Sequence, residues 1–267
     1  MLADRLPVLS SLLRERRRSL VLWAIALAAI NAMYVAFWPA MGAGEEMQAL
    51  VENMPEGLVQ ALGYDAIGTP TGYLESTVFG LLAPALLLVF AIGAGARLLA
   101  GEEEDGTLEL ELAHPIARRR VVAERLGTLV VTVVALVAVT TAVVLALVAA
   151  VDMDVAASAI VATAAGLLLL VLGFGLVAFG LGALTGRRGV ALGVAGGLAV
   201  LAYVTDALAA LVDWGRWLEA FSPFSWYLGP DPLTTGWHAG SLAALAAISV
   251  VAALVALVAF DRRDVGV

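Results

Sequence analysis

The sequence predicts an all-α membrane protein with six transmembrane helices, and its composition and its apolar runs both indicate this fold class. Of the 267 residues, 62% are hydrophobic and 14% are charged, which is more apolar surface than one soluble domain of this length buries. Six uncharged runs approach the roughly 20 residues that a helix needs to cross a bilayer. These runs are continuously apolar, whereas the strands of a membrane barrel alternate, so helices are the expected spanning elements.

The chain is expected to form one transmembrane domain over residues 1–267. Its spans are predicted at about 20–40, 75–99, 121–150, 156–185, 188–212 and 239–260. The third apolar run follows Arg125 and reaches Ala150. The outer boundary of the fifth span is the least defined, because Asp206 interrupts the apolar run before 212.

The arginines predict the orientation of these spans. The chain has no lysine, so all 15 basic residues are arginine, and an excess of them marks the cytoplasmic side of a membrane protein. The arginines that the six spans place on one side are Arg5, Arg14, Arg16, Arg17, Arg18, Arg97, Arg118, Arg119, Arg120, Arg125, Arg187, Arg188, Arg262 and Arg263. Only Arg216 falls on the other side. Both termini are therefore expected in the cytoplasm of a multi-pass protein of the cell membrane.

Three segments outside the spans have patterns of their own. Leucines recur at helical spacing within residues 1–18 among several arginines, which favours an amphipathic helix in the membrane interface over a disordered basic leader. The outer loop 42–73 is acidic and has the apolar periodicity of a helical cap. The outer loop 206–238 is rich in tryptophan and other aromatic residues, which is typical of anchoring at the membrane surface, and part of it is expected to re-enter the outer leaflet.

Glycines in the fourth and fifth spans predict close helix packing. Gly189, Gly193 and Gly197 recur at every fourth position, and small residues with this spacing let two helix backbones approach. The partner helix belongs either to the same chain, which we favour, or to a second copy.

Several kinds of chemistry are excluded by the residues present. A P-loop ATPase needs a lysine to reach the nucleotide phosphates, and this chain has none. The histidines, His114 and His238, fall on opposite sides of the predicted bilayer and cannot share a metal site. We therefore predict no catalytic residue, no metal site and no cofactor in this chain. The spans also lack a charged residue near the bilayer midplane, where ion-coupled carriers usually have one.

The loop between the second and third spans is the most informative segment. Residues 101–120, GEEEDGTLELELAHPIARRR, join an acidic run to a basic run. Leu108, Leu110 and Leu112 alternate as in a strand, yet Leu108 and Leu112 also fit one turn of a helix, and the pattern does not decide between them. Pro115 suits the first turn of the helix that becomes the third span.

These residues resemble a known family, the permease subunits of ATP-binding cassette (ABC) transporters with the type 2, export-class architecture. The matching positions in the loop are Glu104, Gly106, Thr107, Leu108 and Glu109, followed by Pro115 and Arg118. Further matches are Ser222, Pro223, Phe224, Tyr227, Gly229, Pro232 and Leu233, and then Phe260, Arg262, Arg263 and Asp264. The resemblance covers essentially the whole chain.

The resemblance implies that this loop forms a coupling helix that docks on a separate P-loop ATPase subunit. ATP and Mg²⁺ would bind on that partner, and two permeases, identical or paralogous, would work with two ATPases to export a substrate. The implied ATPase contacts are Glu103, Glu104, Gly106, Thr107, Leu108, Glu109, Leu112, Pro115 and Arg118. Glu109 and Glu111 make the segment more acidic than the leucine-rich family pattern. The alternatives are a solvated acidic loop, a non-transporting scaffold that recruits a cytoplasmic partner, and an ion-coupled carrier.

Overall fold

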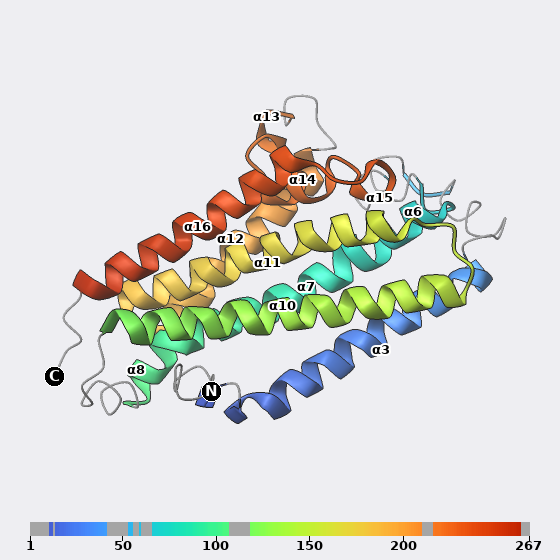
Figure 1. Ribbon diagram of the computed structural model, residues 1–267. Coiled ribbons are helices and arrows are strands. Elements are labelled where there is room, and N and C mark those ends of the chain that lie inside the picture. The colour runs from blue at the N-terminus through green and yellow to red at the C-terminus, as the bar shows by residue number, and fades with distance from the viewer. Residues whose placement is uncertain are drawn as a thin grey trace.

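A computed structural model describes residues 11–12, 14–41, 53–55, 59, 66–106, 118–209 and 216–262. Every regular element within these ranges is a helix, and six helices are long and apolar enough to cross a membrane. The predicted all-α fold with six spans is therefore confirmed (Figure 1).

Five spans are single α-helices. They are α3 (Arg17–Met41), α10 (Arg118–Ala150), α11 (Ala157–Thr185), α12 (Arg188–Ala209) and α16 (Ala239–Arg262). The fifth span, α12, includes Asp206 inside its last turns, so the charge does not end this helix.

The second span is built from five consecutive helical pieces. They are α6 (Pro70–Tyr73), the π-helix η1 (Leu74–Leu82), α7 (Ala83–Ala96), the π-helix η2 (Arg97–Gly101) and α8 (Glu102–Glu104). The hydroxyl of Thr69 accepts a hydrogen bond from the Gly72 amide at 3.1 Å and caps the first turn. Pro84 lies in the first turn of α7, where its missing N–H and fixed φ favour the start of a new helical segment after η1.

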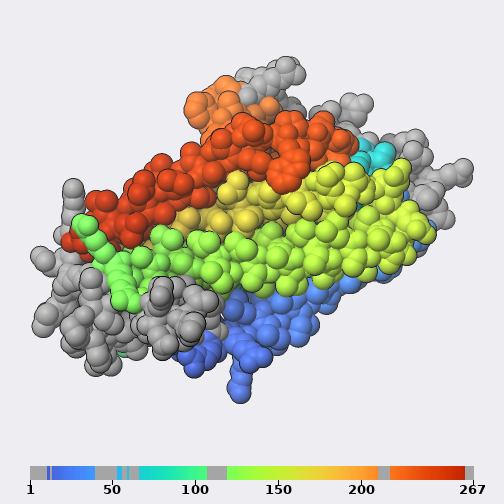
Figure 2. Space-filling model, in the orientation of Figure 1, coloured from blue at the N-terminus to red at the C-terminus, as the bar shows by residue number. Residues whose placement is uncertain are grey.

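Helix α11 forms the centre of the bundle and packs against α7, α10, α12 and α16. In Figure 2 it is visible between α16 and α10. Gly175 allows the close approach to α7, because a Cβ there would lie 3.1 Å from the Ala91 side chain. Gly180 faces α16, where a Cβ would be in ordinary van der Waals contact, 3.5 Å from the Ala252 carbonyl. The glycines of the fourth span therefore pack within the chain.

The glycines of the fifth span do not pack against the other described helices of the chain. A Cβ at Gly189, Gly193 or Gly197 would meet no atom of the described residues within 4 Å, so the expectation that these residues pack on a helix of the same chain is wrong. The reason is a rotation of the helix: the alanines at positions 191, 195 and 199 are buried against the bundle, which turns the glycine stripe outward.

Three short helices lie at the end of the bundle opposite the start of α3 (Figure 1). They are α13 (Arg216–Glu219), α14 (Pro223–Leu228) and α15 (Pro232–Thr235). The buried Tyr227 of α14 donates a hydrogen bond to the Phe79 carbonyl of η1 at 3.1 Å. The aromatic loop is thus divided, because Phe224 and Tyr227 are buried in the bundle while Trp217, Phe221 and Trp237 are exposed.

Two predicted segments fall largely outside the described residues. They are the interfacial helix, of which residues 1–10 and 13 are not described, and the helical cap in the loop 42–73, of which residues 42–52, 56–58 and 60–65 are not described.

Candidate functional site

Charged residues from five helices meet at one end of the bundle, which we call the arginine-rich end. The arginines at this end that line a cavity or make the contacts described below include Arg16, Arg97, Arg119, Arg125 and Arg188. The first residues of α3 and the last of α16 both lie there (Figure 1). Arg119 in the first turn of α10 pairs with Asp261 in the last turn of α16 at 2.5 Å.

Glu102 joins the second span to the third and to the residue that precedes the first. Its Oε2 lies 2.5 Å from Nη2 of Arg125 in α10, and its Oε1 lies 3.5 Å from Nη2 of Arg16. The Arg125 side chain is 0% exposed, and its Nη1 donates a second hydrogen bond, at 2.6 Å, to the Leu98 carbonyl in η2. One carboxylate thus holds together the arginine-rich ends of α3, α8 and α10.

The sequence grouped Arg125 with the other arginines of one membrane side and did not indicate its burial. Helix α10 begins at Arg118, and Arg125 is buried inside it. A buried guanidinium is tolerated only when a counter-charge and hydrogen bonds replace its lost hydration. Glu102 and the Leu98 carbonyl provide both. Glu102 was not among the predicted site residues, since no local pattern connects it with Arg125.

Glu104 makes a second connection, to the fifth span. Its Oε1 accepts a hydrogen bond of 2.9 Å from the backbone N–H of Arg188, the first residue of α12. The first amides of a helix have no partner within the helix, and the positive end of the helix dipole favours a carboxylate there. Glu104 therefore acts as a cap that is contributed by a distant part of the chain.

Replacing Glu104 by alanine is expected to loosen the first turn of α12. Loss of a capping side chain costs about 1 kcal/mol, so amide hydrogen exchange at Arg188 should become several-fold faster while the rest of α12 stays protected. Asp105→Ala is the matched control, because it removes a neighbouring carboxylate that forms no hydrogen bond or ion pair with α12 among the described residues. Equal protection in the two variants would contradict the capping role.

The remaining predicted site residues are only partly described. Glu103 and Gly106 form the turn that ends α8, with the Gly106 amide donating to the Glu103 carbonyl at 3.1 Å. Gly106 has φ +72°, a left-handed conformation that favours glycine. Thr107, Leu108, Glu109, Leu112 and Pro115 lie outside the described residues, as does the side chain of Arg118.

Six apolar spans whose described ion pairs gather at one end define a multi-pass protein of the cell membrane. Residues 7–265 match the family described as ABC-2 family transporter protein. The chain belongs to this family, and it is a permease subunit of an ABC transporter, the membrane component rather than the catalytic one. The predicted resemblance is thereby confirmed. A comparison with curated proteins gave no match.

Proposed function

We propose that this chain is the membrane-spanning subunit of an ABC exporter whose ATP is hydrolysed by a separate P-loop ATPase. Its arginine-rich end faces the cytoplasm, in line with the positive-inside rule. The ATPase docks on the segment that begins at Glu103 and continues through Leu108 and Leu112 to Arg118.

The observation that carries this proposal is the attachment of the acidic residues to several spans. Glu102 is held by Arg16 and Arg125, and Glu104 is held by the first amide of α12. A displacement of residues 102–106 would therefore move the first, third and fifth spans together. This is what a subunit needs if its conformation is changed by a partner that binds at this loop.

The outward face of α12 supports a working unit with two permeases. Gly189, Gly193 and Gly197 leave a stripe of backbone uncovered along this helix, and small residues of this kind let a second helix approach closely within a bilayer. An apolar groove of about 400 Å³ lies between α7 and α12, with Leu88 on one wall and Tyr203 on the other. Two copies, or a copy and a paralogue, that meet along α12 would bring their grooves near a common axis.

Purification from the native membrane tests the ATPase assignment. The tagged chain is expected to retain a P-loop ATPase in mild detergent. After reconstitution, the complex should move molecules that co-purify with it, identified by mass spectrometry, across the bilayer only when Mg²⁺ and ATP are present on the ATPase side. If an ATPase is bound but no substrate moves when ATP is added, the result would favour a non-transporting scaffold. If an ion gradient moves the substrate without ATP, the result would favour an ion-coupled carrier.

Cysteine cross-linking tests the pairing of two permeases through α12. The chain has no cysteine of its own, so Gly193→Cys introduces a single thiol, and oxidation in membranes should give a dimer. Val250→Cys on α16 is the control, because Val250 is also exposed, at 57%, but lies away from α12. Equal cross-linking of both variants would indicate random collision, and a disulfide to a different permease would indicate a paralogous partner.

A further inference from the structure

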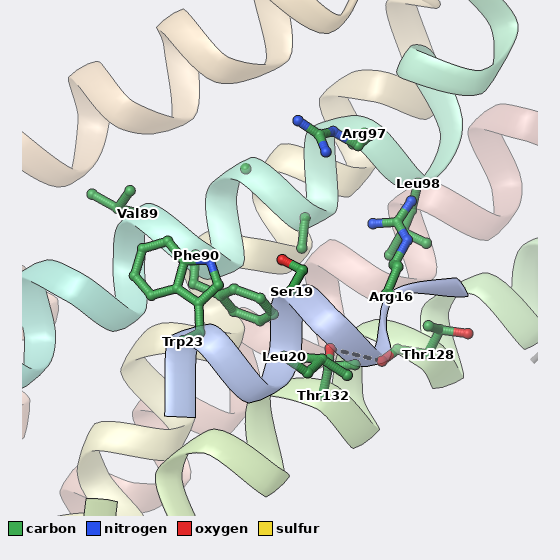
Figure 3. Close-up of a pocket in the computed structure, with 12 residues that line it drawn as sticks. Arg16, Ser19, Leu20, Trp23, Val89, Phe90, Arg97, Leu98, Thr128 and Thr132 are labelled. Carbon is green, nitrogen blue, oxygen red and sulfur yellow. Dashed lines mark hydrogen bonds between the residues drawn. The ribbon is translucent and has the colours of Figure 1, made fainter. Parts of the chain in front are cut away.

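A cavity of about 260 Å³ opens at the arginine-rich end between α3, α7 and α10. Figure 3 shows its two kinds of wall. Arg16 and Arg97 line it from the two sides, with the Ser19 hydroxyl nearby, while Trp23, Val89 and Phe90 line it further along the spans. The cavity is therefore basic where it is near the end of the bundle and apolar where it extends toward the membrane interior.

The basic part has more positive than negative charge. The guanidinium group of Arg16 feels the positive charges of Arg97 and Arg125 and the negative charges of two carboxylates, those of Glu102 and Glu15. The pKa of Arg16 is lowered, mainly because the side chain is buried. The carboxylates of Glu102 and the exposed Glu15 act to raise this pKa, and the positive charges of Arg97 and Arg125 act to lower it. Arg97 makes no ion pair with any carboxylate in the described part of the chain. An anion that entered the cavity would offset the repulsion between these arginines.

The apolar part fits a hydrocarbon chain. The rings of Trp23 and Phe90 meet edge to face with their centroids 5.6 Å apart, and Leu20 and Val89 extend the same wall. A small water-soluble anion would use only the arginines and leave this wall in contact with water. An amphiphile with an anionic head would cover both parts.

We propose that this cavity binds an anionic phospholipid from the surrounding leaflet, with its phosphate at Arg16 and Arg97 and one acyl chain along Trp23 and Phe90. The site is formed by residues of one chain and does not depend on an ATPase partner. Its test can therefore fail or succeed independently of the proposed function.

Native mass spectrometry of the purified full-length chain in neutral detergent measures this binding. We expect the first dioleoyl phosphatidylglycerol to bind at least about fivefold more tightly than dioleoyl phosphatidylcholine, the preference that one well-placed arginine gives near a membrane surface. Arg97→Gln should abolish the preference, and because Arg97 has no ion pair to break in the described structure, the fold should persist. Arg97→Lys should keep most of the preference.

Matched variants separate this site from general attraction to the basic surface. Arg18→Gln removes one charge from the same end of α3 outside the cavity and should leave the preference unchanged. Trp23→Ala should weaken phosphatidylglycerol binding by removing the apolar wall. Equal binding of the two lipids by the native chain, equal losses in Arg18→Gln and Arg97→Gln, or displacement of the lipid by inorganic phosphate would each overturn the proposal.

Discussion

Replacing Glu102 by glutamine is expected to lower the free energy of unfolding by about 3–5 kcal/mol, the cost of removing one partner from a buried ion pair. Arg125 is 0% exposed and Glu102 is 18% exposed, so the substitution leaves a buried guanidinium without its carboxylate. Unfolding of the chain in detergent, followed by circular dichroism against increasing denaturant, measures the loss. The variant should also show weaker attachment of residue 16, seen as faster hydrogen exchange around it.

Asp261→Asn is the control for this substitution. It also converts a carboxylate to an amide in an ion pair at the arginine-rich end, but its partner Arg119 is 79% exposed. An exposed pair contributes about 0–1 kcal/mol, so this variant should unfold close to the native chain. If Glu102→Gln and Asp261→Asn have equal effects, the Glu102 junction does not stabilise the fold as argued.

Replacing Gly95 by alanine is expected to disrupt the contact between α7 and α11. A Cβ at this position would lie 2.2 Å from the Gly175 carbonyl oxygen and 3.1 Å from the Phe179 amide. These are backbone atoms of the central helix, which cannot rotate away as a side chain can. The cost should reach or exceed about 3 kcal/mol, the upper part of the range for overpacked cores, and reduced folding yield and denaturant stability would report it.

Gly93→Ala is the control on the same helix. A Cβ at Gly93 would have no atom within 4 Å in the part of the chain that the structure describes, and alanine is favoured over glycine inside a helix by about 0.5–1 kcal/mol. This variant should therefore be at least as stable as the native chain. A similar loss of stability in both variants would show that the close approach at Gly95 is not the cause.

The six spans could be predicted because lipid imposes a simple requirement. A segment in the bilayer must satisfy its own backbone and present apolar side chains over a fixed thickness, so length and hydropathy are sufficient to find it. The same reasoning does not account for the buried Arg125, since an arginine in a membrane segment is costly. Its burial depends on Leu98, 27 residues earlier, and on Glu102, and no local pattern contains these contacts.

The role of each glycine stripe could not be read from its spacing. Small residues recur along both α11 and α12, but those of α11 pack within the chain whereas Gly189, Gly193 and Gly197 face outward. The difference depends on which side of each helix the bundle covers, and this is decided by tertiary packing. Likewise, the resemblance pointed to Glu104 as a candidate contact residue but not to Arg188, which is 84 residues away.

The bond from Glu104 to α12 has a mechanical consequence for the groove between α7 and α12. At the arginine-rich end the two helices are fastened by this hydrogen bond through the short segment η2–α8. At the other end α12 is held by the edge-to-face contact of Tyr203 with Phe224, and also by the Asp206 carboxylate, which is hydrogen-bonded to Ser222 and to the backbone of Ser225. The groove is therefore fastened by polar contacts at both of its ends. It can widen only if one of these two fastenings releases α12.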